Sequence, residues 1–314
     1  MTSVLITGAA GFLGRHVVEE AARQDAALRL MSHRRPAVVT RPGCAVVCAD
    51  LRDPDSLRGV CEGIDVVMHC ASYIGGSVQN NEFVNAQGTR NLVAEARRAG
   101  VSRVVYVSTA SVYGRGSFCG ATPAELTRNP GSPTSASRAA AEDAVLDAGG
   151  LVLRPHLVYG VGDAWVVPGV SRLLRALPGT VEGWSARLSL VSVHELARLA
   201  VAAGLAPAAD LTAMTYHASH PDPVTAATLL RAVADCAELP WPQRDLTALQ
   251  ACGLLASDPR SLHALDMLRT DHFFDSAPLW RDLRLTPGPG FASAFAQAAP
   301  WYRSALSDAS CAAG

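Results

Sequence analysis

The 314-residue chain contains no lysine: all 27 of its lysine-or-arginine positions are arginine. An arginine guanidinium stays protonated at any ordinary pH, so it cannot release and recover a proton as a lysine amine can. Mechanisms that need a catalytic lysine are therefore excluded before the fold is considered.

Other things that the sequence lacks narrow its class. The net charge is only −1, which gives no long-range field to attract nucleic acid or acidic membranes. No apolar run reaches the ~18–20 residues that a membrane span needs, and the N-terminus has no basic leader. We expect a cytoplasmic monomer or homodimer with neither nucleic acid nor a membrane as its partner.

The eight cysteines are not spaced as metal ligands. None belongs to a Cys-x-x-Cys pair, and Cys44 and Cys48 have no second ligand pair nearby. Small buried hydrophobic residues in a reducing cytoplasm account for them better than a zinc site does. No metal site is predicted.

The residues that are present indicate an α/β protein. Apolar residues make up 49% of the chain and charged residues 18%, which fits a substantial core. Through the first 160 residues, apolar runs alternate with helix-length segments, as in a parallel sheet covered by helices. The sequence predicts a Rossmann fold, a doubly wound parallel sheet. The expected strands are 4–7, 28–32, 45–49, 66–70, 104–108 and 151–154, and the expected helices are 12–23, 53–60 and 85–98.

The pattern loosens after residue 160. One strand is expected at 188–193 and one helix at 194–204, while the rest is rich in proline, glycine and bulky aromatic residues. We expect a dinucleotide-binding domain over 1–160, regained at about 186–206, and a smaller substrate-binding cap of 161–185 and 207–314. All five tryptophans lie in this half. Trp165 and Trp184 are candidates to line its pocket, although aromatic residues more often form plain core.

A glycine loop connects the first expected strand to the first expected helix. Gly8 permits a tight turn, Gly11 lets the backbone approach a pyrophosphate, and Gly14 allows the helix to pack closely on the strand. The pyrophosphate would then lie on the positive N-terminus of the helix, at Phe12 and Leu13. A purely structural turn is the alternative interpretation.

The end of the second strand indicates the type of cofactor. NAD-preferring folds tend to place a carboxylate there, whereas this chain has Ser32-His33-Arg34-Arg35. Guanidinium groups bind a 2′-phosphate bidentately, so the sequence predicts NADP(H), with Arg34 ahead of Arg35. A solvated basic turn is the alternative. Asp50, directly after the third strand, is placed to accept a hydrogen bond from the adenine amino group.

Together with the glycine loop, several short motifs resemble the extended short-chain dehydrogenase/reductases over about two-thirds of the chain. These motifs are Asp50-Leu51, His69-Cys70-Ala71, Asn85-x-x-Gly88-Thr89, residues 107–114, Arg154-Pro155 and Tyr159-Gly160. The resemblance implies a nicotinamide-dependent oxidoreductase. It also places Leu51, Cys70, Ala71 and Pro155 beside the cofactor.

The chain departs from this family at the residues that carry the chemistry. The family uses a Ser/Thr, a Tyr and a Lys, and here Thr109 stands at the first position, with Ser108 and Ser111 as near alternatives. Thr134 stands at the tyrosine position and Arg138 at the lysine position. A threonine hydroxyl cannot act as an acid as tyrosine does, and arginine cannot pass a proton along. Arg138 can still bind ribose hydroxyls and supply a fixed positive charge.

Two interpretations follow from this departure. In the first, the protein is a ketoreductase whose proton comes from elsewhere, since hydride transfer needs only an oriented nicotinamide beside a carbonyl. Resemblance to reductases of antibiotic biosynthesis implies a ketone on a polycyclic aromatic, angucyclinone-like polyketide, whose own phenol supplies the proton. In the second, the protein is a non-catalytic NADP(H) sensor.

Two further side chains are candidates for the end of the pocket where the reaction takes place. Tyr73 follows the His69-Cys70-Ala71 motif and is a candidate acid that also contacts the substrate. His156 follows Arg154-Pro155 and is a candidate pocket residue, although a packing role for it has more weight.

Overall fold

Seven parallel strands form the central sheet of the computed structural model, which describes residues 1–34 and 44–311. Their order is β12-β7-β5-β4-β1-β2-β3. Successive strands are added on one side of β1 up to β3 and on its other side from β4 on, so the strand order reverses at β1 and confirms the predicted Rossmann fold. The strands are β1 (Thr2–Thr7), β2 (Ala26–Ser32), β3 (Ala45–Cys48), β4 (Val66–His69), β5 (Arg103–Val107), β7 (Leu151–Arg154) and β12 (Thr215–His217).

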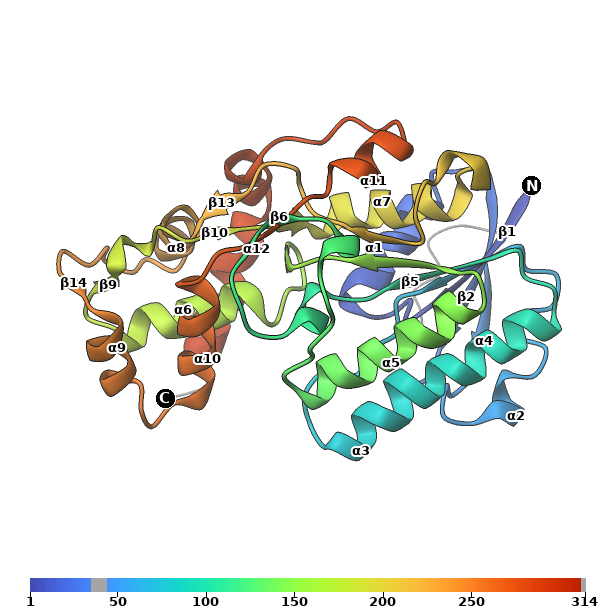
Figure 1. Cartoon of the computed structure of the whole chain (residues 1–314), viewed down its shortest axis with the longest axis horizontal. Helices are drawn as coiled ribbons and strands as arrows, with labels where there is room; N and C mark the ends of the chain where they lie inside the picture. Colours follow the sequence, from blue (N-terminus) through green and yellow to red (C-terminus); the bar gives the residue numbers. More distant parts are fainter. Residues whose placement is uncertain (35–43, 312–314) are drawn as a thin grey trace.

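Helices cover both faces of this sheet (Figure 1). Val4 and Ile6 of β1 face the core under α1 (Phe12–Ala21) and α7 (Val193–Leu205). Leu5, between them, faces the opposite core, because successive side chains of a strand alternate. That second layer consists of α2 (Pro54–Leu57), α3 (Val78–Asn81), the π-helical turn η1 (Glu82–Gln87), α4 (Gly88–Arg98) and α5 (Pro133–Asp147).

The cap elements gather at the far end from the N-terminus (Figure 1) and have a core of their own. Its centre includes Trp184, Leu229 and Tyr302. No described helix is both long and apolar enough to cross a membrane. The remaining helices and turns of the described chain are η2 (Ala110–Tyr113), η3 (Pro123–Glu125), α6 (Val166–Ala176), η4 (Glu182–Trp184), η5 (Ala208–Asp210), α8 (Ala226–Cys236), α9 (Ala248–Leu254), α10 (Pro259–Leu268), α11 (Ala277–Asp282) and α12 (Phe291–Cys311). The strands outside the central sheet are β6 (Phe118–Ala121), β8 (Leu157–Tyr159), β9 (Thr180–Val181), β10 (Arg187–Leu188), β11 (Leu190–Ser192), β13 (Val224–Thr225), β14 (Asp245–Leu246) and β15 (His272–Phe274).

The structure corrects two expectations for the second half. The strand expected at 188–193 is two strands, because β10 pairs with β13 and β15 whereas β11 pairs with β8. Residues 207–314 are not all cap, since β12 forms the edge of the nucleotide sheet beside β7. Trp280 of α11 also packs in the core under α1 and α7. A strand of three residues gives no usable periodicity, which explains why β12 was missed.

Candidate functional site

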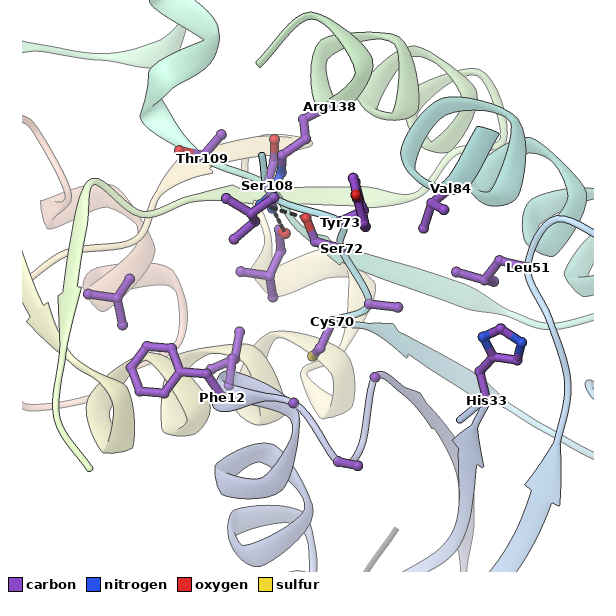
Figure 2. A pocket seen from close by; sticks show the side chains of 18 of the residues that line it. Phe12, His33, Leu51, Cys70, Ser72, Tyr73, Val84, Ser108, Thr109 and Arg138 are labelled. Carbon is purple, nitrogen blue, oxygen red and sulfur yellow. Dashed lines mark hydrogen bonds between the residues drawn. The ribbon is translucent and has the colours of Figure 1, made fainter. Parts of the chain in front are cut away.

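A cavity of about 890 Å³ opens along the carboxyl ends of the central strands. This volume lies in the range typical of sites for small molecules and cofactors. Figure 2 shows His33 at one end of the cavity, Phe12 and Cys70 along it, and Thr109 and Arg138 at the other end. A crevice at the point where the strand order reverses is the usual ligand site of a doubly wound sheet.

The glycine loop has room for nothing larger than hydrogen at two of its positions. Gly8 has a φ of +67°, in the left-handed region, and a Cβ there would lie 2.7 Å from the Ala71 nitrogen. A Cβ on Gly14 would lie 2.0 Å from the Gly8 oxygen, whereas a Cβ on Gly11 would lie 3.0 Å from that atom. Gly14 therefore packs α1 against the loop, while Gly11 lines the cavity.

The N-terminus of α1 suits an anionic group. The helix has no side-chain cap and no acidic residue in its first turn, and Phe12 and Leu13 line the cavity. The first N–H groups of a helix have no partner within it and carry partial positive charge. A pyrophosphate fits this position, with the first-turn amides as its donors.

The far end of the cavity is basic. His33 and the exposed Arg34 line it, whereas Arg35 lies outside the described residues. Asp50 also lines it, but Arg52 Nη2 lies 2.6 Å from Asp50 Oδ2, and Arg52 Nε lies 3.1 and 3.0 Å from the two carboxylate oxygens. The hydrogen bonds from Arg52 are the main reason that the pKa of Asp50 lies below its usual value. The negative charge of Asp50 is thus neutralised by Arg52. Its predicted bond to adenine stays a prediction.

The opposite end of the cavity, lined by Ser108, Thr109 and Arg138 and called the reacting end below, contains two buried polar atoms without a hydrogen-bond partner among the described residues. Arg138 Nη1 donates to Ser72 Oγ at 3.1 Å, as Figure 2 shows, and Nη2 donates to the Val107 oxygen. Among the described residues, Arg138 Nε and Ser108 Oγ have no hydrogen-bond partner, although both are buried and both residues line the cavity. Buried polar groups are nearly always paired, so these two atoms are available to the polar groups of a ligand bound at this end.

Thr109 lines the cavity, but its hydroxyl already has a structural role. It accepts from the Ser111 nitrogen at 3.1 Å and donates to Ser111 Oγ at 3.1 Å, which caps η2. Ser111, the other alternative at this position and a predicted substrate contact, is exposed and lies outside the cavity lining, and its contact with the substrate stays a prediction. Ser108, the alternative at this position, offers the unpaired hydroxyl.

Thr134 is not brought to the reacting end. Ser132 caps α5, with Pro133 at its first position, which places Thr134 in the first turn of the helix. Thr134 Oγ1 accepts from the Gly75 nitrogen at 3.2 Å and lies outside the cavity lining. The structure therefore corrects its grouping with Thr109 and Arg138. The Thr134 hydroxyl, at the position of the family's tyrosine, thus binds the backbone of the loop after β4.

Tyr73 lines the cavity from that same loop. Asn85 fixes its backbone on both sides, since its Oδ1 accepts from Tyr73 N at 2.7 Å and its Nδ2 donates to Tyr73 O at 2.9 Å. A Cβ on Gly76 would lie 2.2 Å from the Tyr73 hydroxyl, so the phenol packs against that glycine. Asn85 is part of the Asn85-x-x-Gly88-Thr89 motif, but the sequence did not predict its two hydrogen bonds to the backbone of Tyr73, because they join η1 to the loop after β4.

His156 and the two tryptophans have different outcomes. His156 lines the cavity and stacks on His272 with 5.4 Å between ring centroids. Burial, with smaller contributions from two other histidines, lowers the pKa of His156 to about 3, so it is neutral and cannot serve as an imidazolium acid at neutral pH.

Trp165 is 61% exposed and lines the cavity. Trp184 is 2% exposed in the cap core, so its prediction as a pocket residue is wrong.

His69 is a buried structural residue at the end of β4. Its Nδ1 lies 2.7 Å from Thr7 Oγ1 and its Nε2 lies 2.9 Å from Thr89 Oγ1, which links β4 to β1 and α4. Burial, and secondarily the charge of Arg138, lowers the pKa of His69 to about 3.

Acid should therefore destabilise the fold through His69. The folded-state pKa of His69 lies below the unfolded value of about 6.5, so the unfolded chain binds the proton more tightly. The contribution of neutral His69 to the free energy of unfolding is fully present above about pH 6.5 and is lost as the pH is lowered. At pH 5 the loss from this residue is about 2 kcal/mol. Urea unfolding at pH 7.5 and pH 5 should show a fall that is about 2 kcal/mol larger in the wild type than in His69→Gln. Equal falls would contradict this.

Residues 4–217 match the model of the NAD dependent epimerase/dehydratase family. The chain belongs to this family. The 2-alkyl-3-oxoalkanoate reductase of Stenotrophomonas maltophilia is 25% identical to it, over 90% of this chain and 94% of that one. A 4-hydroxy-2-methyl-3-oxo-4-farnesyl-3,4-dihydroquinoline-1-oxide ketoreductase of Stigmatella aurantiaca is 29% identical over 52% of each chain. The fold is shared with the Bordetella bronchiseptica enzyme WbmH in complex with NAD+, with a TM-score of 0.76 and 22% identity over 97% of this chain and 99% of that one.

As a member of the epimerase/dehydratase family, the chain has a complete cofactor cavity and an altered reacting end. Gly8, Gly11 and the α1 N-terminus fit a nicotinamide dinucleotide, and the unpaired Arg138 Nε and Ser108 Oγ fit polar groups of a bound ligand. Neither the tyrosine nor the lysine of the resemblance is present. Any reaction here must obtain its proton in another way.

Proposed function

We propose that the protein is an NADP(H)-dependent ketoreductase that reduces a carbonyl of a polycyclic aromatic, angucyclinone-like polyketide in antibiotic biosynthesis. The observation that carries this proposal is the reacting end of the cavity, where Ser108 Oγ and Arg138 Nε are buried and have no hydrogen-bond partner in the part of the chain that the structure describes. Both can donate hydrogen bonds, yet neither is an acid at neutral pH. The reductase relatives support the reaction class.

The substrate class rests on chemistry and on a resemblance. Thr134 and Arg138 in a chain without lysine resemble the angucyclinone C7 ketoreductase of simocyclinone biosynthesis. Such substrates bear phenols next to quinone-like carbonyls. A phenol held beside the reacting carbonyl replaces the absent tyrosine as the acid. The exposed indole of Trp165 offers a face on which a planar ring system stacks.

The side chains divide the work of this reaction. Gly8, Gly11 and the N-terminus of α1 would hold a nicotinamide dinucleotide, which when bound would supply a hydride for the carbonyl carbon. The α1 amides bind the pyrophosphate, and Arg34 binds the 2′-phosphate. Ser108 donates a hydrogen bond to the carbonyl oxygen, and the fixed charge of Arg138 stabilises the negative charge that develops there. The substrate phenol gives its proton to that oxygen, and solvent later restores the phenol.

A non-catalytic NADP(H) sensor is the second candidate, favoured by the position of Thr134 outside the cavity lining. The cavity nevertheless extends beyond the glycine loop to His156 and Trp165, which gives a ketone a place to bind. The test is consumption of NADPH with an angucyclinone-type ketone and detection of the alcohol product. Tight cofactor binding without turnover of any such ketone would establish the sensor instead.

The basic end of the cavity predicts the cofactor preference. Arg34→Ala should raise the Kd for NADPH about 10- to 100-fold, the equivalent of one charge-assisted bidentate contact, and leave the Kd for NADH unchanged. Arg58→Ala is the matched control, because Arg58 is 76% exposed and lies outside the cavity lining. Titrations with both cofactors measure the effect. An unchanged NADPH affinity in Arg34→Ala would remove the NADP(H) assignment.

Restoring the family's pair should not restore the family's mechanism. In Thr134→Tyr/Arg138→Lys we expect no gain in kcat, because a lysine amine cannot reproduce the guanidinium contacts of Arg138 with both Ser72 and Val107. The new phenol would also displace the Gly75 contact that Thr134 makes. Steady-state kinetics of the double variant and of each single variant test this. A gain in kcat of about tenfold or more would show that a protein acid is limiting.

A further inference from the structure

Three potential ligand side chains meet away from the cofactor cavity. His16 and Glu19 lie one turn apart on α1, and His194 lies in the first turn of α7. One ligand atom of each lies within 4.8 Å of the others. The rings of His16 and His194 meet edge to face, with 4.5 Å between their centroids. The sequence places these residues almost the length of the Rossmann domain apart, which hid the cluster.

His16 is a buried histidine with one ring nitrogen beside a backbone carbonyl and the other without a partner among the described residues. It is 5% exposed, and its Nε2 lies 3.1 Å from the Val161 oxygen, to which the Arg15 guanidinium also donates. Arg15 Nε also lies 3.3 Å from His16 Nε2. In the tautomer in which Nε2 donates to the Val161 oxygen, the lone pair is on Nδ1. Nδ1 is buried and has no hydrogen-bond partner among the described residues, and Glu19 Oε2 lies 3.6 Å away. Histidines that bind metals are typically fixed in this way, by a backbone carbonyl on the other ring nitrogen.

The other two side chains of the cluster are open to solvent. Glu19 and His194 are exposed, so an ion can reach them from solvent. His194 also borders a second cavity, of about 270 Å³, which gives water or a small ligand access to the cluster.

We propose that His16, Glu19 and His194 bind one divalent transition-metal ion, with Zn²⁺ as the ion whose chemistry fits best. Two imidazoles and a carboxylate are a known three-ligand set for zinc, and they leave a fourth position for water. The ion fastens α1 to α7 and, through His16, to the segment after β8. This site stands apart from the reduction chemistry and does not rest on the proposed function.

The bound ion should stabilise the wall of the cofactor cavity. Phe12 lines that cavity and packs edge-on against His16, with 6.4 Å between ring centroids. A ligand that binds only the folded state raises stability by mass action. With Zn²⁺ at about 100 times its Kd, we expect a rise in Tm on the order of 5 °C.

The test uses the full-length chain without an affinity tag, stripped of metal and titrated with Zn²⁺ alone and with Co²⁺ alone. We expect one equivalent of Zn²⁺ by calorimetry, and visible Co²⁺ bands of tetrahedral type that Zn²⁺ abolishes. His194→Ala and Glu19→Gln should each weaken binding about tenfold or more and remove the gain in Tm. These two exposed ligands carry the test, since replacement of the buried His16 also disturbs packing.

Two variants serve as matched controls. Glu20→Gln removes a neighbouring carboxylate of α1 that pairs with Arg23 at 2.6 Å, and His263→Ala removes an exposed histidine outside the cluster. Both should bind Zn²⁺ as the wild type does. The absence of a binding event would overturn the proposal. So would binding that persists unchanged in His194→Ala and Glu19→Gln, because the ion would then lie elsewhere, for example on exposed cysteines such as Cys48 or Cys119.

Discussion

Gly14→Ala should weaken binding of the nicotinamide dinucleotide about 100-fold or more. The new Cβ would lie 2.0 Å from the Gly8 oxygen and 2.6 Å from the Gly8 carbonyl carbon, and both are backbone atoms that cannot rotate away. Either the loop or the start of α1 must shift, and the amides that face the pyrophosphate shift with it. Overpacking of this kind costs about 1–3 kcal/mol or more, which corresponds to the expected loss of affinity.

A graded series separates this effect from general damage. Gly11→Ala should be milder, because its Cβ would lie 3.0 Å from the Gly8 oxygen. Gly253→Ala, in the exposed part of α9, has no atom within 4 Å of the new Cβ and should leave binding unchanged. Cofactor titration and thermal unfolding of all three variants measure the series. Wild-type affinity in Gly14→Ala would refute the geometry of the loop described above.

The glycine loop and the sheet could be predicted from sequence because each depends on local signals. Gly8 is needed where φ is positive, and apolar runs such as Val4–Thr7 identify strands buried on both faces. The positions of Phe12, Leu13, Cys70 and Pro155 in the cavity then follow from the topology of the fold. Residues that directly follow a strand of a doubly wound sheet lie at its ligand edge.

Other features depend on contacts between distant parts of the chain. The Arg154 motif of the family carries a buried network, in which Arg154 Nη2 lies 2.5 Å from Glu142 Oε2 and Nη1 lies 2.8 Å from the Tyr113 hydroxyl. No local pattern announces that pairing. The same holds for the contact of Thr134 with Gly75 and for the burial of Trp184 in the cap core. An alignment gives the position of a residue in the chain, whereas packing decides where its side chain points.

The second large effect concerns the proton. If the substrate supplies it, Thr109→Ala, Thr134→Ala and Tyr73→Phe should each lose far less than the ~10²–10⁴-fold in kcat that removal of a general acid costs. The reasons differ among the three positions. Thr109 already donates to Ser111, Thr134 lies outside the cavity lining, and the Tyr73 phenol packs against Gly76. Loss of turnover in Tyr73→Phe, with cofactor and substrate still bound, would identify Tyr73 as the acid.

The most direct measurement compares one ketone substrate with its O-methyl derivative at the phenol next to the reacting carbonyl. The wild-type protein and NADPH are used for both, and kcat is measured together with the Kd of each compound. Substrate assistance predicts that the methylated compound binds with similar affinity and that its kcat falls by about 10²–10⁴-fold. Equal kcat values for the two compounds would show that the proton comes from the protein or from solvent, and would contradict the proposed mechanism.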